Sequence, residues 1–223
     1  MATKISAFEP VPDMPGLFTA IKNNLRCTAV LLQTGQVCLF SPVSGLSDAA
    51  KSSLDEIGEV AFLFAPNGYH NGGLVEYAAT FPAASLAAPP VMHKRLTDRT
   101  GLAFDGIEAL RDSLLTGMRL EGLNGLKNGE TWVIAQIDGR CLWHVVDAFG
   151  GQPNKDMKVG RDIRPNTVFP TFGMKDRAVY LAHLKALLGS DTPDMMLPCH
   201  GALTVAADIP QQIAGIYPDL NDA

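Results

Sequence analysis

The feature that most constrains the fold is an alternation of short strand-like runs with helical patterns in the first half of the chain. The runs are apolar and end at turn residues, and the helical patterns between them have apolar residues on one face. Strand, helix, strand, helix, strand is the order of a layered α/β domain. The expected elements are strands at 27–32 and 36–41, a helix at 49–57, a strand at 60–64, a helix near 74–80 and a strand near 85–88.

Turn and capping residues mark the boundaries of these elements. Thr34-Gly35 separates the first two strands, and Pro66-Asn67-Gly68 ends the third. Ser47 is placed to cap the first helix at its N-terminus. Gly58 is expected to end that helix in the left-handed conformation.

The second half gives its strongest local signal at Asp138-Gly139, a type I′ turn between β-rich runs. Within the preceding segment, 89–128, we expect a helix at 107–114 and otherwise loops. A loop rich in Gly, Pro and Asn is expected over 150–170. The elements expected around these are strands at 131–137, 140–146 and 194–197, a helix at 176–188 with Val179, Leu181, Leu184, Leu187 and Leu188 on its apolar face, and a helix at 209–216.

Composition excludes several classes of function. The net charge is −5 with no basic block, which argues against binding to nucleic acid. The first residues lack the apolar core of a signal peptide, and no apolar run approaches the ~20 residues needed to span a bilayer. We therefore expect a cytoplasmic protein with no membrane partner, in which the dispersed cysteines Cys27, Cys38, Cys141 and Cys199 are free thiols.

Three residues of types that bind metals, two histidines and an aspartate, come after strand-like runs. His70 comes after the run at 60–64, Asp147 ends the run at 140–146, and His200 follows the run at 194–197. Ligands gather at strand ends in α/β enzymes because the loops there present side chains on a rigid support. Two imidazoles and a carboxylate suit zinc or iron(II). Each residue alone has a simpler explanation, a hydrogen-bonded structural role.

The order and context of these residues resemble the metallo-β-lactamase fold, an αββα sandwich. In that family H-x-H-x-D-H-x-G-G follows a buried strand, where this chain has Ala65-Pro66-Asn67-Gly68-Tyr69-His70-Asn71-Gly72-Gly73. Val146-Asp147-Ala148-Phe149 resembles the segment of the family's bridging aspartate. Leu197-Pro198-Cys199-His200-Gly201 resembles the turn of its last histidine. The likeness extends from about Thr28 to Gly201 and implies a single domain over 1–223.

The sequence also resembles an uncharacterised, divergent branch of the same superfamily. That branch has P-N-x-x-H in place of the full motif, here Pro66 to His70, and A-P-P after the next strand, here Ala88-Pro89-Pro90.

The family's two-metal centre is reduced in this sequence. The resemblance places Ala65 and Asn67 where two histidines of the first metal site would be, and the third falls near Leu123. The second site keeps His70, Asp147 and His200, with Tyr69 in place of an aspartate. The resemblance therefore implies at most one zinc or iron(II) ion, held by three protein ligands with an open position. Asp147 would then serve as both ligand and base. Tyr69 would ligate the metal, donate a hydrogen bond to an oxyanion, or simply pack.

Three hypotheses about function follow. The first is a metal-dependent hydrolase of low activity acting on a small ester, lactone or thioester, a substrate class that comes from the resemblance alone. The second is a non-catalytic binding or regulatory protein with a metal-free site. The third is a non-haem iron oxidoreductase. In each case the partner is a small molecule, and the oligomeric state stays open, a homodimer included.

The remaining histidines are interpreted as structural or solvent-exposed. His144 should face the side of the sheet opposite Asp147. His183 is expected to be solvated on its helix, and His93 to lie in a surface loop. Cys199 beside His200 makes a poor nucleophilic pair, because adjacent residues in a turn rarely point at each other.

Overall fold

Two mixed sheets with flanking helices make up the two compact units of the chain, residues 1–116 and 117–223. The computed structural model describes residues 3–153 and 159–220. Among the described residues, no helix is both long and apolar enough to cross a membrane.

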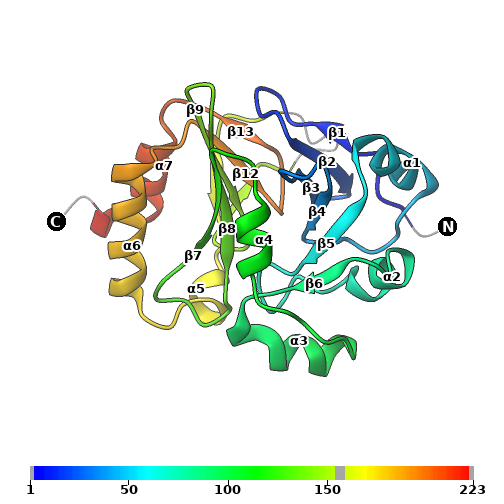
Figure 1. The fold of residues 1–223 in the computed structure, drawn as a ribbon. Helices are drawn as coiled ribbons and strands as arrows, with labels where there is room; N and C mark the ends of the chain where they lie inside the picture. The colour runs from blue at the N-terminus through cyan, green and yellow to red at the C-terminus, as the bar shows by residue number, and fades with distance from the viewer. Residues whose placement is uncertain (1–2, 154–158, 221–223) are drawn as a thin grey trace. The chain divides into compact units, whose positions relative to one another are not determined.

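The first unit contains a six-stranded sheet in which the strands follow their sequence order, β1 to β6. Strands β1 to β4 pair antiparallel, and β4, β5 and β6 pair in parallel. Figure 1 shows α1 and α2 beside this sheet. The elements are β1 (Glu9–Pro10), β2 (Leu17–Lys22), β3 (Leu25–Leu31), β4 (Val37–Phe40), α1 (Asp48–Ile57), β5 (Val60–Phe64), α2 (Leu74–Thr80), β6 (Ser85–Ala87), the 3-10 helix η1 (Pro90–Met92), α3 (His93–Thr100) and α4 (Glu108–Ser113).

The core of this unit lies between one face of the sheet and the helices. Alternate residues of the strands point to it, as period-two packing requires. Helices α1, α2 and α3 close it from the other side with residues such as Leu54, Tyr77 and Leu96, all fully buried. Strand members of the same cluster are Cys27, Ala29, Val37, Leu39 and Leu63.

The predicted cap of α1 is confirmed, but the predicted end geometry is wrong. Ser47 Oγ accepts a hydrogen bond from the Ala50 N–H at 2.9 Å. Gly58 ends the helix with φ 157° and ψ 168°, a positive-φ conformation that favours glycine but is not the predicted left-handed helical one. A Cβ at Gly58 would lie 2.3 Å from the Gly35 carbonyl oxygen, so close backbone approach explains the glycine.

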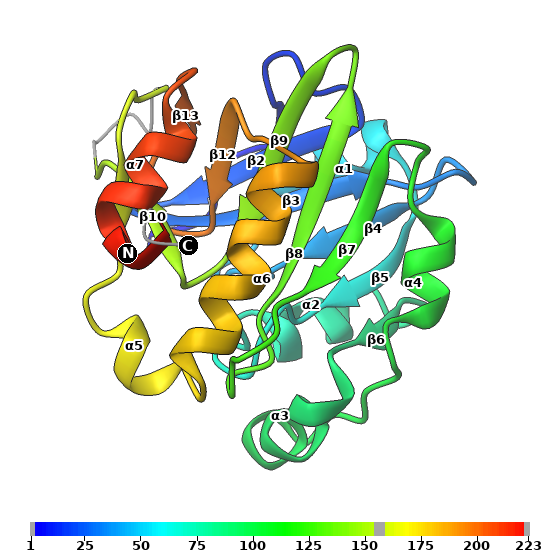
Figure 2. The same cartoon turned by 90° about the vertical axis from the view of Figure 1, so that its left-hand side faces the viewer.

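The second unit contains a five-stranded sheet in the order β13-β12-β9-β8-β7 and a two-stranded β10-β11 ribbon. Figures 1 and 2 show α6 running alongside strands β7, β8 and β9. The elements are β7 (Met118–Gly122), β8 (Thr131–Ile137), β9 (Arg140–Val145), β10 (Phe149–Gly151), β11 (Ile163–Pro165), α5 (Phe169–Phe172), α6 (Arg177–Ser190), β12 (Met195–Pro198), β13 (Thr204–Val205), α7 (Ile209–Ile216) and the 3-10 helix η2 (Pro218–Leu220).

Strand β9 joins a local hairpin to a long-range partner. Asp138 and Gly139 have φ of 50° and 80°, as a type I′ turn requires, and they connect β8 to β9. On its other side β9 pairs in parallel with β12, with Val145 opposite Pro198. The ends of β9 and β12 therefore lie at the same edge of the sheet.

Helix α6 begins at the predicted place, and its buried face agrees with the prediction in part. Asp176 Oδ1 accepts from the Val179 N–H at 3.0 Å as the N-cap. Val179, expected on the apolar face, is 46% exposed, whereas Tyr180 is fully buried. Buried Leu181, Leu184 and Leu187 agree with the prediction.

Two stretches expected to be loops contain regular structure. Segment 89–128 holds η1, α3 and β7 in addition to the predicted helix. Segment 150–170 holds the end of β10, all of β11 and the start of α5, while residues 154–158 of that predicted loop lie outside the described residues. These elements are short or polar, so they lack the hydrophobic periodicity on which sequence patterns depend.

A buried carboxylate, Asp191, joins several elements of the second unit. Arg119 on β7 donates to both carboxylate oxygens, at 2.8 and 2.7 Å. Gln136 on β8 donates to Oδ1, and the Trp143 indole on β9 donates to the Asp191 backbone oxygen at 2.8 Å. The hydrogen bonds from Arg119 lower the pKa of Asp191 below its ordinary value.

We predict that Asp191→Asn lowers the free energy of unfolding by about 1.5–3 kcal/mol at pH 7, because it removes charge-assisted hydrogen bonds from a buried acceptor. Urea unfolding measures this change. Asp138→Asn is the matched control, since Asp138 is exposed and Asn suits the type I′ turn.

The effect should depend on pH with a defined sign. A lowered folded-state pKa stabilises the protein above the unfolded pKa of about 3.9, and this contribution is lost as the pH falls further. The difference between wild type and Asp191→Asn should therefore shrink in acid. A difference that stays constant from pH 7 to pH 3 would contradict the assignment.

Candidate functional site

Asp147 and His200 are brought together at the edge where β9 and β12 end. Each lies two residues beyond the register pair Val145 and Pro198. His200 Nε2 donates to Asp147 Oδ1 at 3.1 Å. Asp147 is buried and His200 is partly exposed. The second unit thus joins two of the three predicted ligands on a rigid support.

The backbone of the His200 turn is hydrogen-bonded to the last residues of strands β9 and β10. The Cys199 N–H donates to the Val145 oxygen at 3.0 Å, and the Gly151 N–H donates to the His200 oxygen at 2.9 Å. Gly201 has φ 95°, and a Cβ there would lie 2.3 Å from the Gly151 oxygen. A glycine is therefore required for this turn to place His200 where it lies.

Glu130 holds the loop that carries Asp147 by accepting hydrogen bonds from its backbone. Sequence reasoning missed this residue. Its Oε1 accepts from the backbone N–H groups of Asp147 and Ala148 at 3.1 and 3.0 Å, and from the Trp132 indole at 2.7 Å. Its Oε2 accepts from the Asn128 amide at 3.1 Å. Burial, followed by the charge of Asp147, raises the pKa of the Glu130 carboxyl above its ordinary value. A single sequence gives no signal for this role, because the contacts are long-range.

His70 lies in the first unit, in the loop that follows β5. Asn67 is fully buried, and its Oδ1 accepts from the N–H groups of Tyr69 and His70 at 2.8 and 3.0 Å. Ser41, directly after β4, hydrogen-bonds His70 Nδ1 through its hydroxyl at 2.6 Å. The loop is thus folded by an Asx turn and the imidazole ring is oriented by a buried serine, which sequence reasoning also missed.

The aromatic ring of Tyr69, in the same loop, packs against the guanidinium group of Arg95 on helix α3. Its side chain is 44% exposed, and the Arg95 guanidinium carbon lies 4.2 Å from the centre of its ring. Arg95 Nε also donates to the Gly68 oxygen at 3.0 Å. Packing, one of the three roles considered for Tyr69, is therefore present.

The other histidines have structural partners. His144 is buried and donates through Nδ1 to the Leu197 oxygen at 2.8 Å, in line with its predicted structural role. His183 is not solvated as expected: Nδ1 accepts from the Asn124 N–H and Nε2 donates to Glu121, both at 3.1 Å. His93 begins helix α3 rather than lying in a loop, and it donates to the Ala88 oxygen at 2.9 Å.

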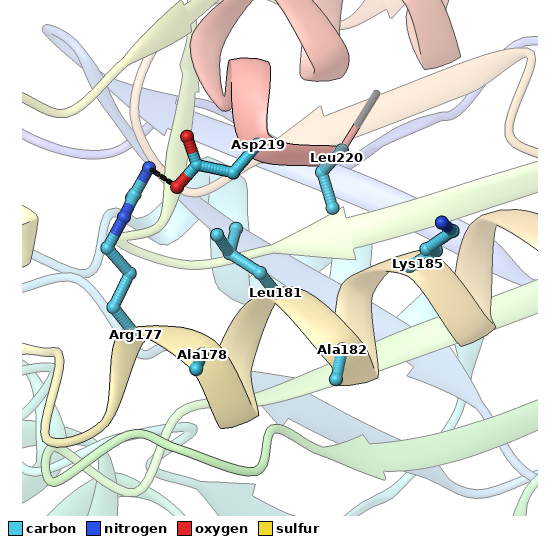
Figure 3. A pocket seen from close by; sticks show the side chains of 7 residues that line it. All are labelled: Arg177, Ala178, Leu181, Ala182, Lys185, Asp219 and Leu220. Carbon is cyan, nitrogen blue, oxygen red and sulfur yellow. Dashed lines mark hydrogen bonds and ion pairs between the residues drawn. The ribbon is translucent and has the colours of Figure 1, made fainter. Parts of the chain in front are cut away.

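A cavity on the second unit lies away from the Asp147–His200 pair. It measures about 460 Å³ and lies between α6 and η2 (Figure 3). Its lining is mostly apolar, and its carboxylate, Asp219, is paired with Arg177 at 2.7 Å. It lacks a group of side chains that would hold a metal or start a reaction.

Comparison with known proteins identifies the fold. No family model matches the sequence, and no curated protein is similar to it in sequence. The structure is similar to the metallo-β-lactamase FIM-1 from Pseudomonas aeruginosa in its mono-zinc form, with 10% identity, 97% of this chain and 96% of that chain covered, and a TM-score of 0.62. It is similar to VMB-1 with 7% identity, 98% and 100% coverage, and a TM-score of 0.61.

A metal-soaked flavodiiron core, Flv1 from Synechocystis sp. PCC6803, is also similar, with 12% identity and a TM-score of 0.58. The match covers 99% of this chain and 62% of the flavodiiron core, so the chain spans about three fifths of that protein's length. These likenesses confirm the predicted fold class, a layered α/β fold of the metallo-β-lactamase type.

We predict that Glu130→Ala lowers the free energy of unfolding by about 2–4 kcal/mol, because it leaves several buried donors without their acceptor. Glu130→Gln is the matched control, since it keeps the Oε1 acceptor for the Asp147 and Ala148 N–H groups and should lose less. Urea unfolding of both variants measures the difference. An alanine variant as stable as wild type would refute the role of Glu130.

Proposed function

We propose that this chain, which has the metallo-β-lactamase fold, is a hydrolase-like protein that holds one divalent metal ion on His70, Asp147 and His200. The observation that carries the proposal is the Asp147–His200 pair at the ends of two parallel strands. We include His70 as the third ligand because the family that the sequence resembles has a metal-binding histidine at this place in the chain. Zinc and iron(II) both suit two imidazoles and a carboxylate.

The distance within the pair supports a shared metal. Two ligands at ~2.0–2.1 Å from a tetrahedral zinc ion lie roughly 3.3 Å apart. His200 Nε2 and Asp147 Oδ1 are 3.1 Å apart. A metal would therefore need a small outward shift of these atoms and the tautomer of His200 in which Nε2 carries no proton.

The contacts of His70 support coordination through its other ring nitrogen. Ligating histidines usually donate their second N–H to a neighbouring acceptor, which fixes the tautomer and the ring orientation. Ser41 already engages Nδ1, so Nε2 is the nitrogen that would bind the ion.

The donor set fits one metal ion rather than two. Ala65 has no donor atom and is fully buried. The Asn67 oxygen is bonded to two backbone N–H groups, and Leu123 is a buried apolar residue. These three occupy the places where the resemblance would put the first metal site.

The chemistry follows from three ligands and an open position. A metal ion so held would lower the pKa of bound water toward ~7 and polarise a carbonyl group. Asp147 is held in place by Glu130 and would accept the proton through its second oxygen, Oδ2. The Tyr69 hydroxyl would donate to the oxyanion that develops on the substrate. A small ester, lactone or thioester suits this arrangement, and turnover would be slow because one carboxylate is both ligand and base.

A metal-free binding protein is the second candidate, and the same contacts support it. His200 has a hydrogen-bond partner in Asp147 and His70 has one in Ser41, as structural histidines do. In that case the loops at the strand ends would bind a small molecule without reaction. A third candidate, a non-haem iron oxidoreductase, would use the same three ligands as the hydrolase but would hold iron(II) and carry out redox chemistry.

We predict that protein incubated with zinc or iron(II) and then dialysed retains close to one ion per chain, and that His200→Ala and His70→Ala lose it. Elemental analysis measures the stoichiometry. His183→Ala and His93→Ala are matched controls that should keep the ion, because both histidines have structural partners. Retention of no metal by wild type would favour the binding protein.

We predict that Tyr69→Phe lowers kcat by about 100-fold on a small thioester while metal content stays unchanged, because it removes one oxyanion donor and keeps the ring beneath Arg95. Steady-state kinetics and elemental analysis of the same preparation check this. Loss of the metal in Tyr69→Phe would instead identify the hydroxyl as a ligand. Unchanged kcat would leave Tyr69 with packing alone.

A further inference from the structure

Arg95 on α3 is fixed against the loop that carries His70. Its Nε donates to the Gly68 oxygen at 3.0 Å, and its guanidinium lies over the Tyr69 ring at 4.2 Å. A Cβ at Gly68 would lie 2.9 Å from Arg95 Cδ and 2.5 Å from Met92 Sδ, so both side chains pack closely against the backbone of this loop. Arg95 is therefore half-buried and held in one orientation.

The charge of Arg95 has no acidic partner among the residues that the structure describes. The neighbouring Lys94 is paired with Asp98 at 2.7 Å, and Arg99 is exposed to solvent. Helix α3 carries Lys94, Arg95 and Arg99 against Asp98, a net charge of +2 in a chain of net charge −5. A half-buried, unpaired cation beside a candidate ligand loop favours an anion from outside the chain.

The two contacts of Arg95 do not use the N–H groups on its two terminal nitrogens. The cation–π contact with Tyr69 places the guanidinium carbon 4.2 Å from the ring centre, and Gly68 uses the N–H at Nε. The in-plane N–H donors of the two terminal nitrogens remain, and their geometry matches a carboxylate or phosphate in bidentate fashion.

We propose that Arg95 recognises a carboxylate or phosphate group on the substrate. This inference rests on the proposed function and narrows its substrate class to anionic esters, lactones or thioesters. Gly68 and His70 are two residues apart, at most roughly 7 Å along the chain, so the anionic group is expected a few bonds from the acyl carbon that reacts. Arg95 binds the group and positions the acyl carbon, while Tyr69 serves as the platform for the guanidinium.

The test is a titration of chelator-treated protein with monomethyl succinate, followed by NMR at the arginine Nε–H signals. Methyl butyrate, a neutral ester of similar size, is the ligand control, and inorganic phosphate separates phosphate from carboxylate recognition. We expect a saturable shift of the Arg95 signal with monomethyl succinate and none with methyl butyrate. A shift with phosphate at lower concentration would assign the site to phosphate esters.

Matched variants distinguish a specific site from general charge. Arg95→Gln should weaken monomethyl succinate binding by about tenfold or more, whereas Arg99→Gln, the same change on the same helix, should leave it within about twofold. Arg95→Lys, which keeps the charge and loses the planar fork, should fall between them. Circular dichroism melts confirm that each variant is folded.

Equal weakening by Arg95→Gln and Arg99→Gln, equal binding of methyl butyrate, or no saturable binding at millimolar concentration would overturn the inference. The titration is done without metal, so its failure is distinct from failure of the metal site. Loss of metal binding in the elemental analysis would remove the hydrolase proposal and leave the Arg95 result to stand by itself.

Discussion

The parallel pairing of β9 with β12 is the interaction on which the candidate site depends. Asp147 and His200 are 53 residues apart in the sequence, yet the Val145–Pro198 register places both just beyond the same edge of the sheet. A shift of one residue in that register would move one of the two side chains by about 3.3 Å and reverse its face. The turn at Gly201 also packs closely against the backbone of Gly151, and this contact helps to hold His200 in place.

Polar groups, among them the buried residues Asp191 and Glu130, hold β9 near both ends and make this register specific. At its start, Asp194 accepts from the Cys141 N–H at 3.0 Å, and the Asp191 backbone accepts from the Trp143 indole. Beyond its end, Glu130 accepts from the N–H groups of Asp147 and Ala148. Buried carboxylates are costly unless fully hydrogen-bonded, so their partners disfavour alternative registers strongly. The precision of the Asp147–His200 pair therefore depends on side chains outside the site.

The features that were predicted correctly from the sequence are those that local patterns encode. The Asp138-Gly139 hairpin, the Ser47 and Asp176 caps and helices α2 and α7 follow from turn chemistry and periodicity, and order along the chain was enough to select the candidate ligands. Sequence reasoning missed strand β2, helix α3 and strand β7, whose patterns are weak. It also missed Ser41, Glu130 and Arg95, because each acts through contacts with residues 27 to 29 positions away or across a buried network that one sequence does not reveal.

The most direct test of the central claim is anomalous diffraction from crystals grown with zinc and collected on both sides of its absorption edge. The account predicts one peak per chain, within about 2.0–2.2 Å of a nitrogen of His70, a nitrogen of His200 and a carboxylate oxygen of Asp147. A second peak beside Asn67 would contradict the single-ion site. No peak at Asp147 and His200, with the 3.1 Å hydrogen bond between them intact, would contradict metal binding itself.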